Sequence, residues 1–397
     1  MSGWRETELG PLPASWSLIT VGRLIEGGVI DKPLDGNHGE IHPKGSDFVA
    51  EGIPFVMATD INGGKIDLVN CKFITKEQAD SLSKGFAIRE DVLLTHKATL
   101  GRTAVVGNIK TPYIMLTPQV TYYRVIDKNR LHNKFLKYYF DSPVFQDTLV
   151  NHGDSGSTRA YIGITAQREL PVILPNNINE QKAIAAVLSS LDDKIDLLHR
   201  QNQTLEAIAT TLFRQWFVEE AQENWREVRL VDYFPVVTGK KDANFSTDGG
   251  EYPFFTCSQS AIKAPSYSFE GAAILLSGNG DFNVKRYTGK FEAYQRTYVL
   301  IPYDVKYFSF LYTLMKFYLL EITGGYQGSV INFITKGMIT EFKFRLPDEH
   351  INIDEKLAQF NKLYEKIDSN NSQIQTLEKL RDTLLPKLMS GEVRVAV

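Results

Sequence analysis

The chain has 397 residues and a formal net charge of −3, and 43% of its residues are hydrophobic and 11% aromatic. This composition excludes a largely disordered chain, and the length favours two folded domains. Cys71 and Cys257 are the only cysteines, which excludes a disulfide framework and a zinc site built on CxxC motifs. The opening stretch MSGWRETELG lacks the apolar core of a signal peptide and no apolar run reaches membrane-spanning length, so we expect a cytoplasmic protein.

One architecture is written twice along the chain. The stretch QTLE occurs at 203–206 and again at 375–378. The two copies are offset by 172 residues. A repeat period this long indicates tandem domains, because solenoid repeats are far shorter. The same offset relates three further pairs: KID at 194–196 and 366–368, Leu-Pro at 174–175 and 346–347, and Gly-Ser at 156–157 and 328–329.

Two regions, 1–178 and 222–350, are rich in glycine, aromatic and β-branched residues, with short apolar runs between turn signals. In each region one run predicts a strand and another predicts a helix, so both are expected to be mixed α+β domains. The strand runs are PYIMLTPQVTYYRVI (112–126) and RTYVLIPYDV (296–305), and the helix runs are NKFLKYYFDSPVFQDTLV (133–150) and VKYFSFLYTLMKFYLLEIT (305–323).

The segments that follow, 179–221 and 351–391, each predict a long helix, and a short tail, 392–397, ends the chain. Apolar residues recur there in steps of four and three, a period of about 3.5 residues that is typical of a coiled-coil seam. The first seam contains Ile184, Leu188, Leu191, Ile195, Leu198, Asn202, Leu205, Ala209, Leu212 and Trp216, and the second contains Phe360, Leu363, Ile367, Asn370, Ile374, Leu377, Leu384 and Leu388.

The two seam asparagines predict the orientation of the helices. A buried asparagine costs stability unless it meets a polar partner, and so specifies register. A parallel pairing would leave both amides unsatisfied, whereas an antiparallel pairing lets Asn202 meet Asn370. That register also places Ile184 opposite Leu388 and Trp216 opposite Lys356.

The sequence thus predicts an α+β fold of two tandem globular domains, each followed by a long α-helix. The two helices are expected to pair as an antiparallel coiled coil with pseudo-two-fold symmetry, as in a caliper. The alternative is two amphipathic helices that pack separately, each on its own domain.

No catalytic signature survives a search of the sequence, and we expect no catalytic residue, cofactor or metal. GDSGSTR lacks the lysine of a phosphate-binding loop, and SGNGDF at 277–282 lacks the third glycine of a dinucleotide site. HGEIH at 38–42 is interrupted by glycine and followed by proline, which favours a surface loop over a metal-binding helix.

Two pairs of polar loops remain as candidates for recognition chemistry. HKATLGR (96–102) and SGNGDFNVKR (277–286) occupy equivalent places, as do HGDSGSTRAY (152–161) and GGYQGSVINF (324–333), and YQR at 294–296 adds another polar cluster. Such side chains donate to phosphates and read base edges, although exposed turn loops would look the same. The candidate DNA-binding residues are Lys97, Thr99, Arg102, Ser157, Thr158, Arg159, Tyr161, Asn279, Lys285, Arg286, Gln295, Arg296, Tyr326, Gln327 and Ser329.

The order of these features resembles the specificity (S) subunits of type I restriction–modification systems. The resemblance rests on GSTRAYIGITAQRELPVILPNNINEQKAIAAVLSSLDDKID (156–196) and on GSVINFITKGMITEFKFRLP (328–347) with KID at 366–368. A Gly-Ser turn, a Leu-Pro strand end, Glu-Gln-Lys and a long helix form the typical run of this family. The second copy departs from it at 350–356, where HINIDEK replaces the Glu-Gln-Lys helix entry.

The resemblance implies that each globular domain is a target recognition domain that reads one half of a bipartite, asymmetric site on double-stranded DNA. It implies that the helical rod sets the spacer and docks two methyltransferase (modification) subunits, which motor/nuclease (restriction) subunits join. It implies no catalytic activity of the chain's own and no membrane partner. Two other classes stay open: a stand-alone DNA methyltransferase or nuclease, and a coiled-coil scaffold without DNA contact.

The tail EVRV (392–395) repeats EVRL (227–230), which begins the second globular domain. We expect the tail to supply a matching strand to the first domain.

Overall fold

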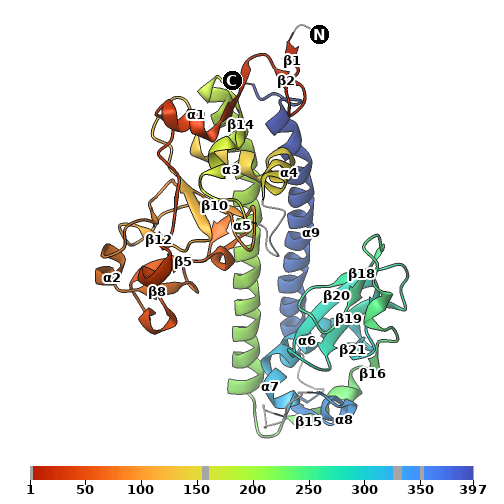
Figure 1. Cartoon of the computed structure of the whole chain (residues 1–397). Helices are drawn as coiled ribbons and strands as arrows, with labels where there is room; N and C mark the ends of the chain where they lie inside the picture. The colour runs from red at the N-terminus through yellow and green to blue at the C-terminus, as the bar shows by residue number, and fades with distance from the viewer. Residues whose placement is uncertain (1–2, 154–160, 325–332, 349–352, 397) are drawn as a thin grey trace. The chain divides into compact units, whose positions relative to one another are not determined.

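The computed structural model describes residues 3–153, 161–324, 333–348 and 353–396 (Figure 1). The chain forms two compact units. The first unit comprises Met1–Ile195 and Gln375–Val397, and the second comprises Asp196–Ile374. Two long helices, α5 (Ile178–Arg214) and α9 (Asp354–Ser390), each contribute one part to either unit. The alternation of strands and helices in both units is the mixed α+β architecture that the sequence predicts.

The first unit is built on two small sheets of four strands. The first has the order β11-β10-β13-β4 and the second the order β8-β5-β12-β9. The strands and short helices of this unit are β1 (Trp4–Arg5), β2 (Leu12–Pro13), β3 (Trp16–Thr20), α1 (Val21–Glu26), β4 (Leu34–Asp35), β5 (Ile53–Val56), β6 (Ile61–Asn62), β7 (Lys65–Ile66), β8 (Lys72–Ile74), α2 (Lys76–Asp80), β9 (Phe86–Ala87), β10 (Val92–Thr95), β11 (Thr103–Val105), β12 (Ile114–Leu116), β13 (Val120–Tyr123), α3 (Asn133–Asp141), α4 (Pro143–His152) and β14 (Pro171–Pro175).

Two of the predicted elements of the first unit are split in the structure. The apolar run 112–126 forms β12 and β13 rather than one strand, because Pro118 cannot donate to a sheet ladder and the chain turns there. The run 133–150 forms α3 and α4 rather than one helix. The Ser142 hydroxyl accepts from the Phe145 amide at 3.4 Å, and Pro143 occupies the first turn, so the serine starts a new helix.

The second unit contains one sheet of six strands with the order β16-β21-β19-β20-β17-β18. Its centre is the long antiparallel pair β19–β20, and the helix α6 packs against both strands. The elements are β15 (Arg226–Arg229), β16 (Val236–Thr238), β17 (Tyr252–Phe255), β18 (Ile262–Ala264), β19 (Phe269–Ser277), β20 (Val284–Ala293), β21 (Thr297–Leu300), α6 (Phe308–Phe317), α7 (Leu319–Ile322), α8 (Lys336–Thr340) and β22 (Lys343–Leu346). The predicted strand at 296–305 is thus shorter, and the predicted helix at 305–323 is divided into α6 and α7.

A two-stranded ribbon precedes each long helix. In the first unit β14 pairs with β3, and in the second unit β22 pairs with β15, both antiparallel. The Leu-Pro repeat ends the second strand of each ribbon, at 174–175 and 346–347. The sequence duplication therefore corresponds to a duplicated structural unit, a ribbon that leads into a helix.

In the first unit, the start of α5 and the end of α9 run antiparallel (Figure 1). Ile184 and Leu388 are buried in the same hydrophobic core. Further along, the guanidinium of Arg381 donates to the Asp192 carboxylate at 3.1 Å. The residues of α5 rise in number as those of α9 fall, which agrees with the predicted antiparallel direction.

In the second unit, the remaining parts of α5 and α9 also pair antiparallel. Asn370 is fully buried, and its amide donates to Oδ1 of Asn202 at 2.8 Å. At the far end of this pairing, Lys356 Nζ lies 5.3 Å from the centre of a Trp216 ring. Both contacts are those that the seam pattern predicts. After Arg214 the helix α5 passes into a π-helical turn at Gln215–Glu219.

The C-terminal tail lies against the first unit, but the prediction that it adds a strand is wrong. Residues 391–396, all of them described, form no strand. Gly391 takes a φ of +76°, and a β-carbon there would lie 2.4 Å from Pro13 Cγ, so only glycine fits this turn. The chain then runs irregularly, with Val393 and Val395 packed on the core and Arg394 bound to Glu180.

Candidate nucleic-acid interface

The loop 96–102 of the first unit is a closed turn between β10 and β11. The Arg102 amide donates to Thr95 Oγ1 at 2.9 Å, and the Thr95 amide donates back to the Arg102 carbonyl at 2.8 Å. Ala98 and Gly101 take the left-handed backbone conformation, with φ of +67° and +86°. The loop is therefore short and rigidly closed at its base, so its outer side chains have defined positions.

Lys97 and Tyr161 meet at the top of this loop. They form an isolated antiparallel bridge, and Lys97 Nζ lies 5.7 Å from the centre of the Tyr161 ring. Both side chains are exposed, so a cation and an aromatic face are available together. Thr99 is half-buried, and its amide donates to the Lys97 carbonyl. Arg102 turns inward instead, donating to the Ile61 carbonyl at 3.1 Å and to Asn62 Oδ1 at 2.6 Å.

The second unit ties its equivalent loop in the same way. In the first unit the Ile162 amide donates to the His96 carbonyl at 3.1 Å, beside the Lys97–Tyr161 bridge. In the second unit the Ile334 amide donates to the Gly278 carbonyl at 2.8 Å, beside an antiparallel bridge between Asn279 and Phe333. Each unit therefore joins the loop after a central strand to the segment that follows its glycine-rich stretch.

Gln295 and Arg296 lie beside this loop in the second unit. The Gly278 amide donates to the Arg296 carbonyl at 2.8 Å, and a β-carbon on Gly278 would lie 2.4 Å from that oxygen. Cys257 Sγ donates to Asn279 Oδ1 at 2.9 Å, and this hydrogen bond orients the asparagine side chain. The side chains of Gln295 and Arg296 are exposed. The structure thus brings Asn279, Gln295 and Arg296 together, and Cys257 is a supporting residue that sequence reasoning missed.

Lys285 and Arg286, by contrast, lie within the body of the second unit. Lys285 Nζ donates to the Thr256 carbonyl at 3.2 Å, and burial lowers the pKa of this lysine. The Arg286 guanidinium donates to Asp368 Oδ1 at 3.0 Å and to the Tyr364 carbonyl at 3.3 Å, both on α9. Its side chain is 12% exposed and lies 4.7 Å from the centre of the Tyr364 ring. This geometry gives Arg286 a structural role, as the anchor of β20 on α9.

The other candidates lie outside the described residues: Ser157, Thr158, Arg159, Tyr326, Gln327 and Ser329.

A buried polar network supports the loop of the first unit. His96 is fully buried, and its Nδ1 lies 2.7 Å from Thr121 Oγ1, which also accepts from the Gln167 amide at 3.2 Å. Its Nε2 has no hydrogen-bond partner among the described residues and lies 4.0 Å from Asp35 Oδ2. Burial lowers the pKa of His96 to about 4, so the imidazole is neutral at neutral pH.

Asp35 joins this network to the surface. Its carboxylate accepts from His38 Nε2 at 2.7 Å and from Lys84 Nζ. Burial raises the pKa of Asp35, but the hydrogen bonds and charges of Lys84 and His38 outweigh that effect and hold it below its usual range. The carboxylate therefore stays ionised and fixes the orientation of the His38 ring.

An open hollow of about 330 Å³ lies next to Lys97. It collects residues from four separate segments of the first unit, which is why no local sequence pattern reveals it. The polar or flexible side chains that line it are His38, His42, Met57, Lys97, Thr117 and Gln119. The histidines are those of the HGEIH segment, and they flank a short 3₁₀ turn at Gly39–Ile41.

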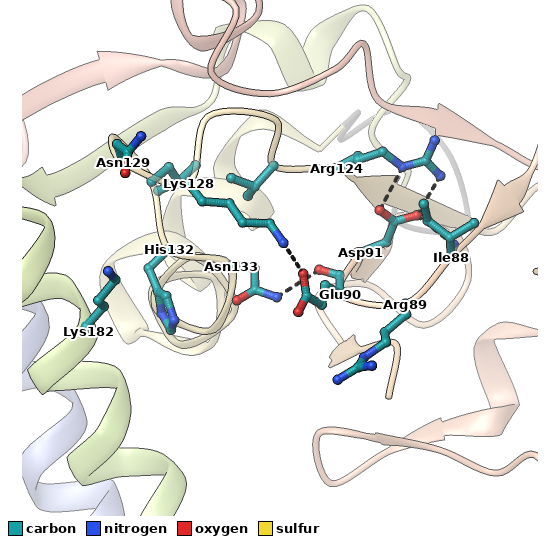
Figure 2. A pocket seen from close by; sticks show the side chains of 12 residues that line it. Ile88, Arg89, Glu90, Asp91, Arg124, Lys128, Asn129, His132, Asn133 and Lys182 are labelled. Atoms are coloured by element: carbon teal, nitrogen blue, oxygen red, sulfur yellow. Dashed lines mark hydrogen bonds and ion pairs between the residues drawn. The ribbon is translucent and has the colours of Figure 1, made fainter. Parts of the chain in front are cut away.

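A second hollow, of about 380 Å³, lies near the start of α5 in the first unit (Figure 2). Figure 2 shows two carboxylates in its lining that each hold a cation: Glu90 pairs with Lys128, and Asp91 accepts from Arg124 at 2.8 Å. Most of the charge in this hollow is thus satisfied internally. Within the residues that the structure describes, no group of acidic, histidine or cysteine side chains has the arrangement of a metal site.

Comparison with known proteins decides the family. The family model for the type I restriction modification DNA specificity domain matches residues 33–207 and again 222–379. The chain belongs to the type I restriction–modification DNA specificity family. Its two matched segments are the two copies of the sequence repeat, so the recognition domain occurs in tandem.

The chain is also similar in sequence to curated type I specificity subunits. The chain is 42% identical over 173 residues to the EcoDI specificity subunit of Escherichia coli, a match that covers 43% of this chain and 39% of that protein. It is 24% identical to the MjaIX specificity subunit of Methanocaldococcus jannaschii over 99% of this chain and 96% of that protein. The crystal structure of a type I S subunit from M. genitalium superposes with a TM-score of 0.60 at 18% identity, over 94% of this chain and 96% of that one.

Of the candidate DNA-binding residues that the structure describes, Lys97, Tyr161, Gln295 and Arg296 are exposed. The helices of the described part are too short or too polar to cross a membrane.

Proposed function

We propose that each globular domain of this specificity subunit reads one half of a bipartite, asymmetric site on double-stranded DNA. Residues 1–178 would read one half through Lys97, Thr99 and Tyr161, and residues 222–350 would read the other through Asn279, Gln295 and Arg296. The proposal rests on a backbone bridge that occurs in both units, between Lys97 and Tyr161 in the first and between Asn279 and Phe333 in the second. In both units, the loop after a central strand is bridged to the segment behind a glycine-rich stretch.

The side chains around these two bridges differ, which supports two unlike half-sites. The first unit offers an ammonium group next to an aromatic ring, and the second offers amides and a guanidinium. Lysine, arginine and amide side chains are the groups that contact phosphates and base edges in DNA complexes. A protein that binds DNA alone usually carries positive charge, whereas this chain has a net charge of −3. Partner subunits would therefore supply part of the contact with the DNA phosphates.

The paired helices α5 and α9 are proposed to set the spacer between the half-sites and to dock two methyltransferase (modification) subunits. Motor/nuclease (restriction) subunits would join that assembly. The chain itself would be non-catalytic and would act in the cytoplasm. The duplicated ribbon before each helix and the asparagine pair within the seam support a fixed register between the helices.

Sequencing of methylated bases in DNA from cells that express this chain with its methyltransferase partner tests the proposal. We expect a bipartite motif with two unlike halves that disappears when the chain is removed. A continuous palindrome, or methylation that persists without the chain, would reject it.

A further inference from the structure

The hollow next to Lys97 has the features of a site for a polar ligand. Thr117 lines the hollow and is 5% exposed, and its buried hydroxyl has no hydrogen-bond partner among the described residues. The half-buried Gln119 amide, which follows it in the turn between β12 and β13, likewise has no partner there. Buried polar groups are normally hydrogen-bonded, so the unpaired hydroxyl of a residue that lines the hollow points to a ligand there.

The two histidines of the hollow have defined hydrogen-bonding roles. His42 Nδ1 lies 3.1 Å from the Asn37 carbonyl, which can only accept, so this nitrogen carries the proton. His38 Nε2 lies 2.7 Å from the Asp35 carboxylate and donates in the same way.

The hollow combines donors with an acceptor. Lys97 donates, and the Gln119 amide both donates and accepts. In the major groove, adenine presents an acceptor at N7 beside a donor at N6, and glutamine matches this pair with two hydrogen bonds. Guanine presents two acceptors, which only the donor half of the glutamine amide would match. Met57 adds an apolar surface of the kind that contacts the methyl group of the paired thymine.

We propose that this hollow reads one adenine–thymine base pair in the major groove, with Gln119 as the specificity-determining residue. The inference rests on the proposed function, because it concerns the half-site that residues 1–178 read. It extends the reading surface from the loop 96–102 to the turn Thr117–Gln119 and to the HGEIH segment.

The test uses the complex of the full chain with its methyltransferase partner and a plasmid library randomised over the first half-site. Gln119→Ala should relax the preference for adenine at one position by roughly ten- to a hundredfold, while every other position stays as in the wild type. Gln119→Glu should shift the preference at that position toward cytosine, whose N4 amino group donates to a carboxylate. Gln78→Ala, a half-buried glutamine on α2 outside the hollow, is the matched control and should leave the motif unchanged.

The outcomes separate this proposal from the proposed function. A bipartite motif that depends on the chain but is unaltered in both Gln119 variants would overturn the adenine site and leave the function intact. A uniform loss of methylation across all library members, with unchanged thermal unfolding, would mean a phosphate contact and would also overturn it. Methylation that does not depend on the chain at all would reject the proposed function itself.

Discussion

The side-chain amide of Asn370 donates to Oδ1 of Asn202 at 2.8 Å, across the seam of α5 and α9 in the second unit. Asn202 in turn donates to Asn371 Oδ1 at 2.8 Å, whereas Asn370 Oδ1 is buried and has no partner in the part of the chain that the structure describes. A polar pair in an apolar seam costs stability and selects one register, because a shift by one heptad would leave both amides facing apolar residues.

Replacing both asparagines should therefore raise stability while weakening the choice of register. We expect Asn370→Leu alone to change the free energy of unfolding little or to lower it, because Asn202 loses a hydrogen bond. The free energy of unfolding of the double variant, Asn202→Leu with Asn370→Leu, should exceed the value expected from adding the effects of the two single variants. The difference, the coupling energy, should be about 1 kcal/mol. Urea denaturation of the four proteins in a double-mutant cycle measures this coupling, and strictly additive effects would show that the contact contributes nothing.

The C-terminal tail should stabilise the first unit through Arg394. Its guanidinium makes two hydrogen bonds to the Glu180 carboxylate, at 2.6 and 3.0 Å, and Glu180 is 3% exposed. Arg394→Ala leaves that buried carboxylate with the Trp16 indole at 3.4 Å as its remaining side-chain partner among the described residues, which should cost about 1–3 kcal/mol.

Chemical denaturation of the full chain measures the cost, and removal of 391–397 should be at least as destabilising. Glu392→Ala is the matched control, because among the described residues the carboxylate of this exposed residue pairs only with the half-buried Lys387 of α9. Equal stability of Arg394→Ala, the truncation and the wild type would show that the tail is not a structural part of the first unit.

Acid should destabilise the first unit through His96. Its folded-state pKa is about 4, below the ordinary value of 6.5, so the unfolded chain binds a proton at a higher pH than the folded chain does. The stability present above pH 6.5 is therefore lost as the pH falls toward 4, by up to about 3 kcal/mol from this group. Burial also lowers the pKa of His132, which acts in the same direction.

His96→Gln removes the titrating group and keeps a polar side chain beside Thr121. Its free energy of unfolding should fall less steeply than that of the wild type between pH 6.5 and pH 4. Denaturation curves measured across this range at constant ionic strength provide the comparison. Parallel pH profiles would mean that His96 is accessible to protons in the folded chain.

Arg286 and Arg296 should behave in opposite ways although both were candidates for DNA contact. Arg286→Ala removes the anchor between β20 and α9 and should lower the stability of the second unit by about 2–4 kcal/mol. Arg296→Ala, at an exposed turn, should change stability by less than about 0.5 kcal/mol and weaken methylation of one half-site. Thermal unfolding together with methylation assays separates the two, and a stable, specificity-altered Arg286 variant would contradict the structural role.

The parts of the fold that the sequence predicts are those governed by local pattern. A heptad-like period predicts the two long helices, and a polar residue in each seam predicts that Asn202 meets Asn370. Breaks inside elements depended on single turn residues, Ser142 with Pro143 and Pro118, whose effect outweighed the apolar run around them.

The candidate site was less accessible to sequence reasoning, because its contacts join distant segments. Nothing near Arg286 in the sequence indicates that the side chain faces Asp368 on a helix some eighty residues later. Likewise, Gln119 and His38 share a hollow only because the turn after β12 and the segment after β4 fold to the same place. The HGEIH spacing was a visible signal, but it pointed to a metal or a loop rather than to a neighbour of Lys97.

The central claim is that two separate surfaces of the chain read two separate half-sites. Motif sequencing of methylated DNA from cells expressing the wild type, Lys97→Ala or Arg296→Ala with the methyltransferase partner tests it most directly. We expect Lys97→Ala to degrade one half of the bipartite motif and leave the other intact, and Arg296→Ala to do the reverse. Loss of the same positions in both variants, or an unchanged motif in both, would contradict it.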